Sequence, residues 1–327
     1  MAYPGIARLS TFEQIKLLAD SRRLSILRHL LAGPASLTQL GHALGEHPAW
    51  VRHHLVRLEQ SGLVEIAEVR TIAGVTEKFY RARADAFILQ EMILPEKSRL
   101  PAVIFSGSHD LAVEALARQL EDHLNVMVLP VGSLDGLVML RQGLCHLSGC
   151  HLLDINGEYN LPFVQHFFPD RTMLVVTLAF REQGLMLFPG NPKQFHNLSD
   201  LVRPGIVFIN RQKGSGTRLW FDNEIHRLGL PTEKIQGYNR EVRLHTECAH
   251  LVQSREADVA IGLRAAASQA GLDFIPLFHE RYDMVIPQEQ LEMLHPLVDT
   301  LQTRTFRQAV KNLPGYDLTH AGEQIPL

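Results

Sequence analysis

The sequence predicts a two-part protein: an α+β module of short helices and one β-hairpin, followed by a larger α/β domain with two lobes. Three observations predict this arrangement. Over residues 1–93, apolar residues recur at the spacing of a helix, and tight turns interrupt this pattern. Strand-like and helix-like runs alternate over residues 102–327, which is typical of parallel α/β units. Two loops rich in Ser and Gly, residues 106–109 and 210–218, each lie between an apolar run and the start of a helix.

The composition is that of an ordinary globular chain. Its 327 residues are 46% hydrophobic and 20% charged, and no apolar run is long enough to span a membrane. The net charge of −3 excludes nucleic-acid binding through overall charge, but residues 1–98 carry +2 and the remainder −5, so we expect a polyanion-binding surface in the first part. Three cysteines are too few for a disulfide framework. The first residues lack a signal-peptide pattern, which predicts a cytoplasmic protein.

Three helices are expected in the first module. Ser36, with Gln39 three residues later, forms a capping box before the second helix, and Gly45 ends that helix. Pro48 lies where a first-turn proline is tolerated. The expected helices are residues 21–31, 37–44 and 49–60. The last two, joined by a tight turn that contains glycine, predict a helix-turn-helix unit.

The third helix of this module has two different faces. Val51, Leu55 and Leu58 form an apolar inner stripe, and aromatic and basic residues form the outer face, as in a helix that enters the major groove. The runs 63–69 and 77–82 predict a hairpin that turns over residues 70–76 and contacts phosphates. The expected DNA-binding residues are Ser36, Thr38, Gln39, Trp50, Arg52, His53, His54, Arg57, Arg70 and Lys78. Two alternatives stay open: the histidines are ordinary solvated residues, or the module docks a protein.

The segments DSRRLSIL (20–27) and VRHHLVRLEQSGLV (51–64) resemble those of winged helix-turn-helix regulators of the ArsR type. The resemblance implies binding to a double-stranded DNA operator as a homodimer that reads half-sites about 34 Å apart. Metal sensors of this type carry paired cysteines on the helix that corresponds to residues 37–44. This chain has none there, so the resemblance does not extend to metal sensing.

The loop NRQKGSGTR (210–218) has the character of an anion site. It follows the apolar run 205–209 and precedes an expected helix over 219–228, whose free N–H groups and dipole favour a negative charge. The loop SGSH (106–109) lies in an equivalent setting, so a two-lobed domain would hold an anion between them. His109 contacts the ligand or caps a helix, and the loop arginines contact ligand or form ion pairs between lobes.

Residues 102–315 resemble the two-lobed, type II periplasmic-binding-protein-like domain that binds molybdate and other oxyanions. The resemblance is carried by segments 208–218, 257–267 and 280–287, and it is closest to a cytoplasmic branch attached to helix-turn-helix domains or molybdenum-cofactor proteins. It implies a molybdate, tungstate or related anionic effector, and a cleft lined also by Glu247. The expected ligand-binding residues are Ser106, Ser108, His109, Ser133, Arg211, Lys213, Gly214, Ser215, Gly216, Thr217, Arg218 and Glu247.

The same resemblance implies how the lobes are joined. Residues 172–180 are expected to form a first crossing strand and 282–287 a returning one, which together act as a hinge. A helix over 288–313 would pack back on the first lobe. Residues 94–101, which are polar and bracketed by prolines, are expected to link the DNA-binding module (1–93) to the ligand domain (102–327).

Enzymatic readings find little support. The order Lys-Gly-Ser-Gly-Thr-Arg does not match a P-loop, and no dinucleotide fingerprint is present. A metal site at Cys145–His151 or a nucleophile at Cys248 is disfavoured. We therefore expect no catalytic residue, metal or cofactor, and a regulator whose DNA binding responds to a small anion. The alternative is a molybdenum-cofactor-related binding protein or enzyme that recognises a phosphorylated cofactor or organic anion.

Overall fold

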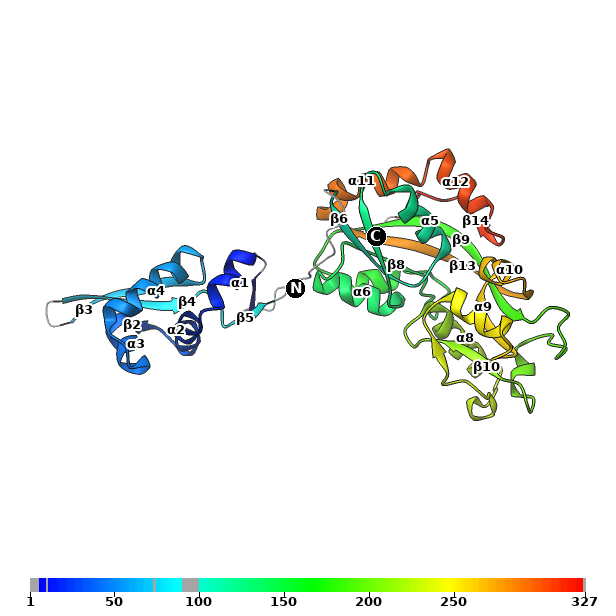
Figure 1. Ribbon diagram of the computed structural model, residues 1–327, viewed down its shortest axis with the longest axis horizontal. Helices are drawn as coiled ribbons and strands as arrows, with labels where there is room; N and C mark the ends of the chain where they lie inside the picture. Colours follow the sequence, from blue (N-terminus) through cyan, green and yellow to red (C-terminus); the bar gives the residue numbers. More distant parts are fainter. Residues whose placement is uncertain (1–5, 10, 73–74, 90–99, 326–327) are drawn as a thin grey trace. The chain divides into compact units, whose positions relative to one another are not determined.

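The computed structural model describes residues 6–9, 11–72, 75–89 and 100–325. The chain divides into two compact units, Met1–Ile93 and Leu94–Leu327, which are coloured from blue to cyan and from green to red in Figure 1. Most of the expected linker, residues 94–99, lies outside the described residues. The predicted fold class is confirmed in each unit.

The first unit is a helical module with a small antiparallel sheet. Its helices are α1 (Phe12–Leu18), α2 (Ser21–Ala32), α3 (Leu37–Leu44) and α4 (Pro48–Gln60). Its strands are β1 (Ile6–Leu9), β2 (Ala35–Ser36), β3 (Val64–Ile72), β4 (Val75–Ala82) and β5 (Ala86–Leu89). The strands β2, β4 and β3 form an antiparallel sheet in that order, and β1 pairs with β5 in parallel.

Local sequence signals explain the helix boundaries of this unit. Ser36 accepts a hydrogen bond from the Gln39 backbone N–H at 3.3 Å, and its own N–H donates to the Gln39 side chain at 3.0 Å. Gly45 ends α3 with a φ of 68°, a left-handed conformation that suits glycine. Val51 and Leu58 are buried in one apolar core, so the predicted inner stripe of α4 is confirmed.

Two predictions for this unit are wrong. The hairpin turn is much shorter than residues 70–76, because β3 continues to Ile72 and β4 begins at Val75. His54 does not lie on the outer face of α4: only 5% of it is exposed, and its ring centroid lies 4.5 Å from that of Trp50. Burial of the His54 ring lowers the pKa of its imidazole.

The second unit is built on one extended sheet with the order β11-β10-β12-β9-β13-β8-β6-β7. Its principal strands are β6 (Ala102–Gly107), β7 (Asn125–Pro130), β8 (Leu147–Cys150), β9 (Met173–Leu187), β10 (Phe208–Arg211), β11 (Glu241–Val242), β12 (Val259–Leu263) and β13 (Asp273–Pro287). The short strands β14 (Tyr316–Asp317) and β15 (Gln324–Ile325) also pair with β9.

Helices cover this sheet in both lobes. They are α5 (Leu111–Gln119), α6 (Ser133–Gln142), α7 (Leu161–Phe167), α8 (Gly216–Arg227), α9 (His245–Gln253), α10 (Arg264–Gln269), α11 (Leu291–Thr300) and α12 (Arg304–Lys311). Three 3-10 turns are η1 (Leu198–Val202), η2 (Thr232–Lys234) and η3 (Gln288–Gln290). No helix within the described ranges is long and apolar enough to cross a membrane.

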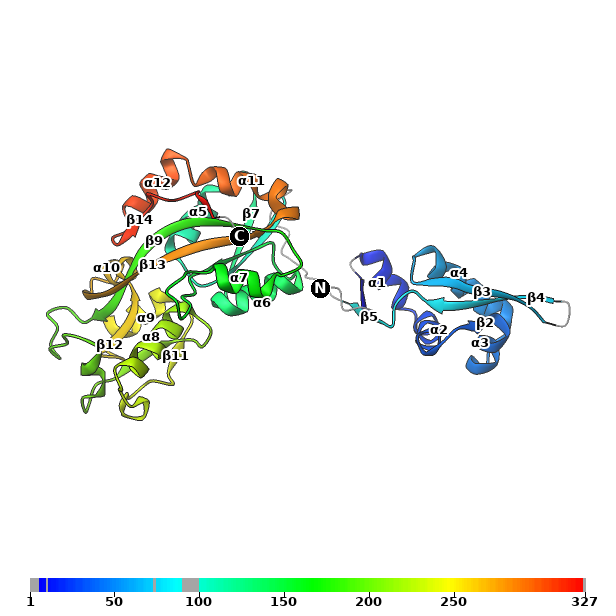
Figure 2. The same cartoon turned by 180° about the vertical axis from the view of Figure 1, so that it is seen from behind.

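Two long strands run through both lobes. β9 and β13 pair antiparallel along most of their length, from Met173 opposite Pro287 to Leu187 opposite Asp273. Figures 1 and 2 show them passing from the lobe of β6–β8 into the lobe of β10–β12. The predicted crossing strands are thus confirmed, and both are longer than expected. Because β6 and β8 run parallel in one lobe and β10 and β12 in the other, each lobe presents strand ends and loops toward the crossing.

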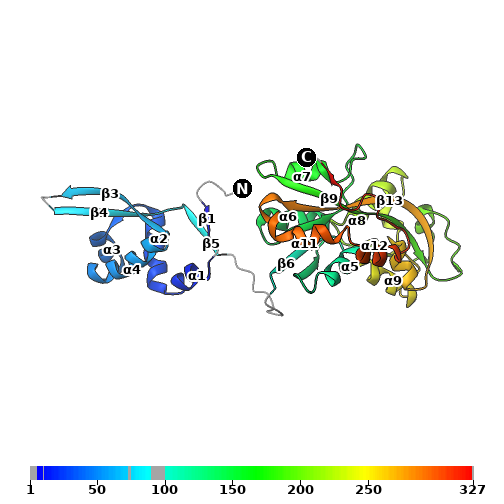
Figure 3. The same cartoon turned by 90° about the horizontal axis from the view of Figure 1, so that it is seen from above.

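The C-terminal helices complete the core of the first lobe. Leu294, Leu297 and Phe306 are buried in the same apolar cluster as residues of α5, and α11, α12 and α5 lie close together in Figures 1 and 3. The prediction of one helix over 288–313 is wrong, because Thr303 caps a new helix, α12, after α11 has ended.

Candidate functional site

The outer face of α4 forms the candidate nucleic-acid surface of the first unit. Arg52, His53 and Arg57 are exposed there. They line a shallow hollow of about 370 Å³ together with Ala49, Val56 and Gln60. An exposed basic helix face of this kind can contact phosphates and base edges.

The remaining predicted DNA-binding residues are placed differently. Ser36 is buried in its capping box, whereas Thr38 and Gln39 are exposed at the start of α3. Arg70 and Lys78 are exposed on the hairpin, where Arg70 pairs with Glu68. Of these two basic side chains on the hairpin, Lys78 has no ion-pair partner among the described residues.

In the predicted anion loop of the second unit, the hydroxyl side chains form hydrogen bonds within the protein. The helix α8 begins at Gly216, earlier than predicted, and Ser215 caps it by accepting from the Arg218 N–H at 3.3 Å. The Ser215 hydroxyl also donates to the Gln212 carbonyl at 2.9 Å, and Thr217 donates to Gln183 Oε1 at 3.0 Å. Lys213 is exposed. The Ser215 and Thr217 hydroxyls thus donate within the protein, and the role of the loop's backbone N–H groups in anion binding stays a prediction.

The two loop arginines have opposite environments. Arg218 forms ion pairs with Asp222 at 2.8 Å and Glu241 at 3.1 Å. Arg211 is buried, and among the described residues it has no ion-pair partner; its Nη2 donates to the Arg243 carbonyl at 2.7 Å, while Nε and Nη1 have no partner. Burial is the main cause that lowers the pKa of Arg211, to about 10. The ion pairs of Arg218 thus lie within the second lobe and not between lobes, as the sequence left open, and Arg211 is the loop arginine that fits the ligand role.

Arg181, which was not among the predicted site residues, organises a buried charge cluster on the crossing strand β9. Its Nη1 lies 2.5 Å from Asp110 Oδ2, and its Nε lies 2.5 Å from Glu280 Oε1. Gln183 Nε2 also donates to Glu280 Oε1, at 2.5 Å. Burial alone would raise the pKa of Glu280, but the charge of Arg181 and the hydrogen bonds from His151 and Gln183 lower it to about 2. Both carboxylates therefore pair with Arg181, whose Nη2 has no partner among the described residues, and neither forms an ion pair with Arg211.

His245 adds unused hydrogen-bonding capacity to this cluster. The side chain is completely buried, and neither ring nitrogen has a partner among the described residues. Burial, followed by the charges of Arg211 and Arg181, holds the pKa of His245 far below its ordinary range, so the ring is neutral. A neutral imidazole offers one donor and one acceptor. Together with the free guanidinium nitrogens of Arg211, it can hold an anion that also carries a hydrogen-bond donor.

The first-lobe loop reaches this cluster through two residues. Ser108 lies 2.9 Å from His151 Nε2, and His109 Nδ1 accepts from the His245 backbone N–H at 3.2 Å. His109 Nε2 lies 2.9 Å from Glu114, so His109 joins the lobes by its ring. The lobes also meet where the Leu134 N–H donates to the Gly214 carbonyl at 3.2 Å.

Two predicted ligand residues, Ser106 and Glu247, lie away from the cluster, and a third, Ser133, only supports it. The Ser106 hydroxyl lies within β6 and hydrogen-bonds Cys145 Sγ at 3.0 Å. Glu247 is exposed and accepts from the Arg243 N–H at 3.4 Å, so it does not line the buried cleft. Ser133 is buried and accepts from the backbone N–H of His151 at 3.3 Å, which leaves it in a supporting position.

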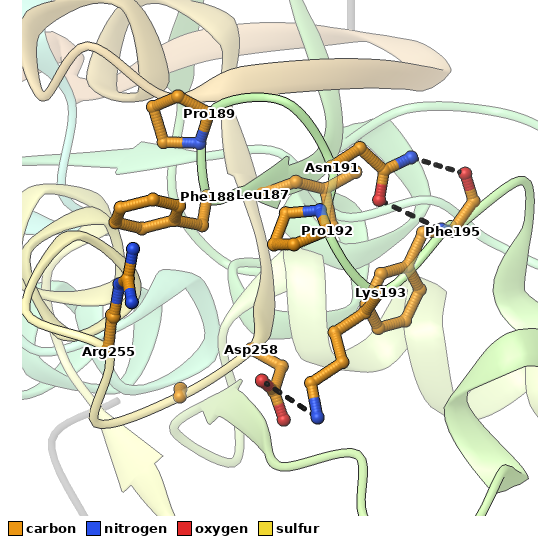
Figure 4. A pocket seen from close by; sticks show the side chains of 10 residues that line it. Leu187, Phe188, Pro189, Asn191, Pro192, Lys193, Phe195, Arg255 and Asp258 are labelled. Carbon is orange, nitrogen blue, oxygen red and sulfur yellow. Dashed lines mark hydrogen bonds and ion pairs between the residues drawn. The ribbon is translucent and has the colours of Figure 1, made fainter.

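A separate cavity of about 350 Å³ lies in the second lobe, at the end of β9 (Figure 4). The Phe188 ring faces the Arg255 guanidinium at 4.1 Å, and Lys193 Nζ lies 3.8 Å from Asp258. None of the predicted ligand-binding residues lines it. The cluster around Arg181 and Arg211, which lies where β6, β8 and β10 end, is therefore the candidate site, as expected for open α/β sheets.

The cysteine-rich segment shows no metal-binding arrangement. Cys145 and Cys150 are buried free thiols, and burial raises the pKa of Cys145 to about 11. His146 Nδ1 accepts from the Ile104 N–H at 2.9 Å. Across the described ranges, no group of three or more His, Cys, Asp or Glu residues could hold a metal ion.

Comparison with known proteins gives matches for both units. Residues 113–302 match the PBP superfamily domain, and residues 20–65 match the arsR family of bacterial regulatory proteins. An uncharacterized protein of Bacillus subtilis (strain 168), YvgK, is 33% identical over 228 residues, which are 69% of this chain and 74% of YvgK. A Clostridium pasteurianum protein from the 5′ region of a 2Fe-2S ferredoxin gene is 36% identical over 107 residues, which are 32% of this chain and 95% of that protein.

Solved structures align with the second unit at low sequence identity. An ABC-type phosphate transport receptor from Vibrio cholerae is 17% identical and has a TM-score of 0.42, over 65% of this chain and 98% of the receptor. Peb3 from Campylobacter jejuni is 15% identical and has a TM-score of 0.44, over 66% of this chain and 98% of Peb3.

Proposed function

This chain belongs to the PBP superfamily, and we propose that it is a transcriptional regulator whose ligand domain binds a small anion and whose N-terminal module binds operator DNA as a homodimer. The arsR-family match supports the DNA-binding role. A protein that acts on operator DNA works in the cytoplasm. The observation that carries the ligand role is Arg211, a buried guanidinium with two unpartnered nitrogens.

The cost of burying Arg211 supports a ligand of opposite charge. A buried cation without a partner is unfavourable, and an anion that accepts from Nε and Nη1 recovers that free energy. His245 and the free Nη2 of Arg181 extend the same set of donors. The resemblance to oxyanion-binding domains makes molybdate and tungstate the first anions to test, with phosphate beside them.

Binding would regulate DNA affinity by favouring one of two states. The donors that would hold the anion are Arg211 and His245 of the second lobe and Arg181 of the crossing strand β9, and the first lobe reaches them where His109 Nδ1 accepts from the His245 backbone N–H. An anion that binds more tightly to the closed arrangement than to an open one shifts the domain toward closure. If the two arrangements differ in operator affinity, linkage makes the anion an effector.

Operator binding with and without candidate anions tests this proposal. DNA duplexes selected by the full-length protein from a random pool serve as the operator. The dissociation constant is measured with molybdate, tungstate, phosphate and sulfate at constant ionic strength, since salt alone weakens DNA binding. We expect at least one anion to change it by about 5- to 150-fold. Equal affinity across the panel would remove the ligand role.

Native mass spectrometry of protein purified without added ligand identifies what the site holds. A bound oxyanion supports the sensor of an inorganic anion. A bound organic or phosphorylated compound would instead favour the molybdenum-cofactor-related alternative.

Replacing Arg52 and Arg57 together with alanine is expected to weaken operator binding while anion binding is kept. Loss of phosphate or base contacts costs about 1–3 kcal/mol each, and the slope of log K against log salt should fall by about 2. Fluorescence anisotropy at several salt concentrations measures both quantities. Arg118→Ala removes the same kind of exposed charge from the second unit and is the control. Equal losses in both variants would contradict the assignment of the α4 face.

A further inference from the structure

Three buried side chains of the second unit form an ordered hydrogen-bonded chain. The Ser108 hydroxyl lies 2.9 Å from His151 Nε2, and His151 Nδ1 lies 2.7 Å from Glu280 Oε2. Glu280 is ionised and can only accept, so His151 Nδ1 carries the proton. His151 Nε2 therefore presents its lone pair to the Ser108 hydroxyl. This is the order of nucleophile, base and orienting acid in enzymes that form acyl-serine intermediates.

The three residues come from separate elements and are held firmly. Ser108 follows β6, where its N–H donates to the Gly149 carbonyl at 3.1 Å and its own carbonyl accepts from Tyr282 Oη at 2.7 Å. The His151 ring stacks on Tyr282, with centroids 5.9 Å apart. Gly216 packs against His151 so closely that a Cβ there would lie 2.4 Å from Nδ1.

Anion capture alone does not explain this chain of hydrogen bonds. Arg211 and His245 supply the unpartnered donors, whereas Ser108 and His151 are directed toward each other. Glu280 is fixed by Arg181 and Gln183 on its other oxygen, so it holds His151 in a single tautomer. The N-terminus of α8 at Gly216, a helix of 12 residues, lies beside His151, where its dipole favours a developing negative charge.

We propose that Ser108 is an acyl-accepting nucleophile, with His151 as its base and Glu280 as a positioning residue. The substrate class is a small carboxylic ester that carries an anionic group. This inference rests on the proposed function, because Arg211 and His245 would hold that anionic group. An effector of this class would be consumed by the regulator that senses it, so each binding event would have a limited lifetime.

The chemistry is balanced without any further reagent. Ser108 Oγ forms a bond to the ester carbonyl carbon, and its proton moves to His151 Nε2. The bond between that carbon and the alcohol oxygen then breaks, and His151 returns the proton to the departing alcohol. Water next attacks the Ser108 ester, gives its proton to His151, and releases the carboxylic acid as the Ser108 hydroxyl is restored.

The reaction should persist in mildly acidic solution. Burial is the main cause that lowers the pKa of His151 below its ordinary value of 6.5, although Glu280 opposes the shift. Arg181, Arg211 and Tyr282 also face the ring from neighbouring elements. Neutral His151 is the active form. As the pH is lowered past 6.5, the rate of Ser108 modification should therefore at first stay constant, and it should fall only when the pH reaches the lowered pKa of His151.

A fluorophosphonate probe tests the nucleophile in the full-length, effector-free protein. The expected product is one phosphonyl group on Ser108, formed with loss of fluoride and located by peptide mass spectrometry. His151→Gln should slow the labelling by about 100-fold or more, since it removes the base. Glu280→Gln should slow it and shift its pH profile. Ser148→Ala, which changes another buried serine of the same lobe, is the control and should be labelled at the normal rate.

Two outcomes would overturn the proposal: no label on Ser108, or an unchanged rate in His151→Gln. Circular dichroism and thermal melting identify a variant that has failed to fold. If a variant has failed to fold, the presence or absence of the label on Ser108 of the wild-type protein decides whether the proposal stands. Ser108→Ala should lose the label. Labelling of Ser108 without any effect of anions on operator binding would contradict the proposed function alone. An effect of anions without labelling would contradict this inference alone.

Discussion

Replacing Arg211 with methionine is expected to raise the melting temperature of the free protein and to abolish its response to the anion. Methionine preserves much of the volume and removes a buried charge that has no ion-pair partner among the described residues. Removing such a charge should stabilise the free protein by about 1 kcal/mol or more. The lost charge-assisted hydrogen bonds should cost about 2–5 kcal/mol of binding free energy, or roughly 30- to 4,000-fold in Kd.

Calorimetry measures both effects on one preparation, by thermal unfolding and by titration with the anion identified in the purified protein. Arg240→Met is the matched control, because Arg240 lies on an exposed part of the same lobe and pairs only weakly, with Glu256 at 3.5 Å. It should change unfolding free energy by no more than about 0.5 kcal/mol. Retained anion binding in Arg211→Met would show that Arg211 is not a ligand.

Replacing Arg181 with methionine should have the opposite effect on stability. The change leaves Asp110 and Glu280 buried without their cation, which should cost about 3–5 kcal/mol of unfolding free energy. In the wild type, the pKa of Glu280 is about 2 when folded, against an ordinary value of 4.5. Its contribution is therefore fully present above pH 4.5 and is lost as the pH falls toward 2. In the variant Glu280, without the charge of Arg181, should gain a proton more readily, so the deficit should shrink in acid.

Urea unfolding at several pH values measures this deficit. The chain has two tryptophans, so a Trp50→Phe background leaves Trp220 as the reporter of the second unit. Arg264→Met is the control, since Arg264 pairs with Glu182 at a more exposed position and should cost at most about 1 kcal/mol. Adding Glu280→Gln to Arg181→Met should recover part of the loss. Equal losses for Arg181→Met and Arg264→Met would contradict the central role of the buried cluster.

Local signals explain why the first unit could be predicted closely. The capping box of Ser36 and Gln39, the glycine at position 45 and the first-turn Pro48 each act within a few residues of a helix end. His54 shows how such a signal can be overlooked. Val51, His54, Leu55 and Leu58 follow the spacing i, i+3, i+4, i+7, so the apolar stripe itself placed His54 inside.

The candidate site was harder to predict because its contacts join distant segments. Arg181 and Glu280 lie opposite each other in the register of β9 and β13, and no sequence pattern sets that register. The available signal was a charged residue within a long apolar strand run. Arg218 had a nearby acid at position 222, an i, i+4 pair that indicates an ion pair, whereas the isolation of Arg211 could be recognised only once the whole lobe was folded.

The passage of β9 and β13 through both lobes also bears on the order in which a growing chain can fold. The second lobe is encoded between these strands, so it can assemble while the first lobe still waits for β13, α11 and α12. The cluster that joins Ser108 to Glu280 cannot form before residue 280 is synthesised. At ribosomal rates that is roughly 10–40 s after residue 93 has been added. Under the proposed function, each newly made molecule thus completes its helix-turn-helix module before the cluster that would hold the anion can form.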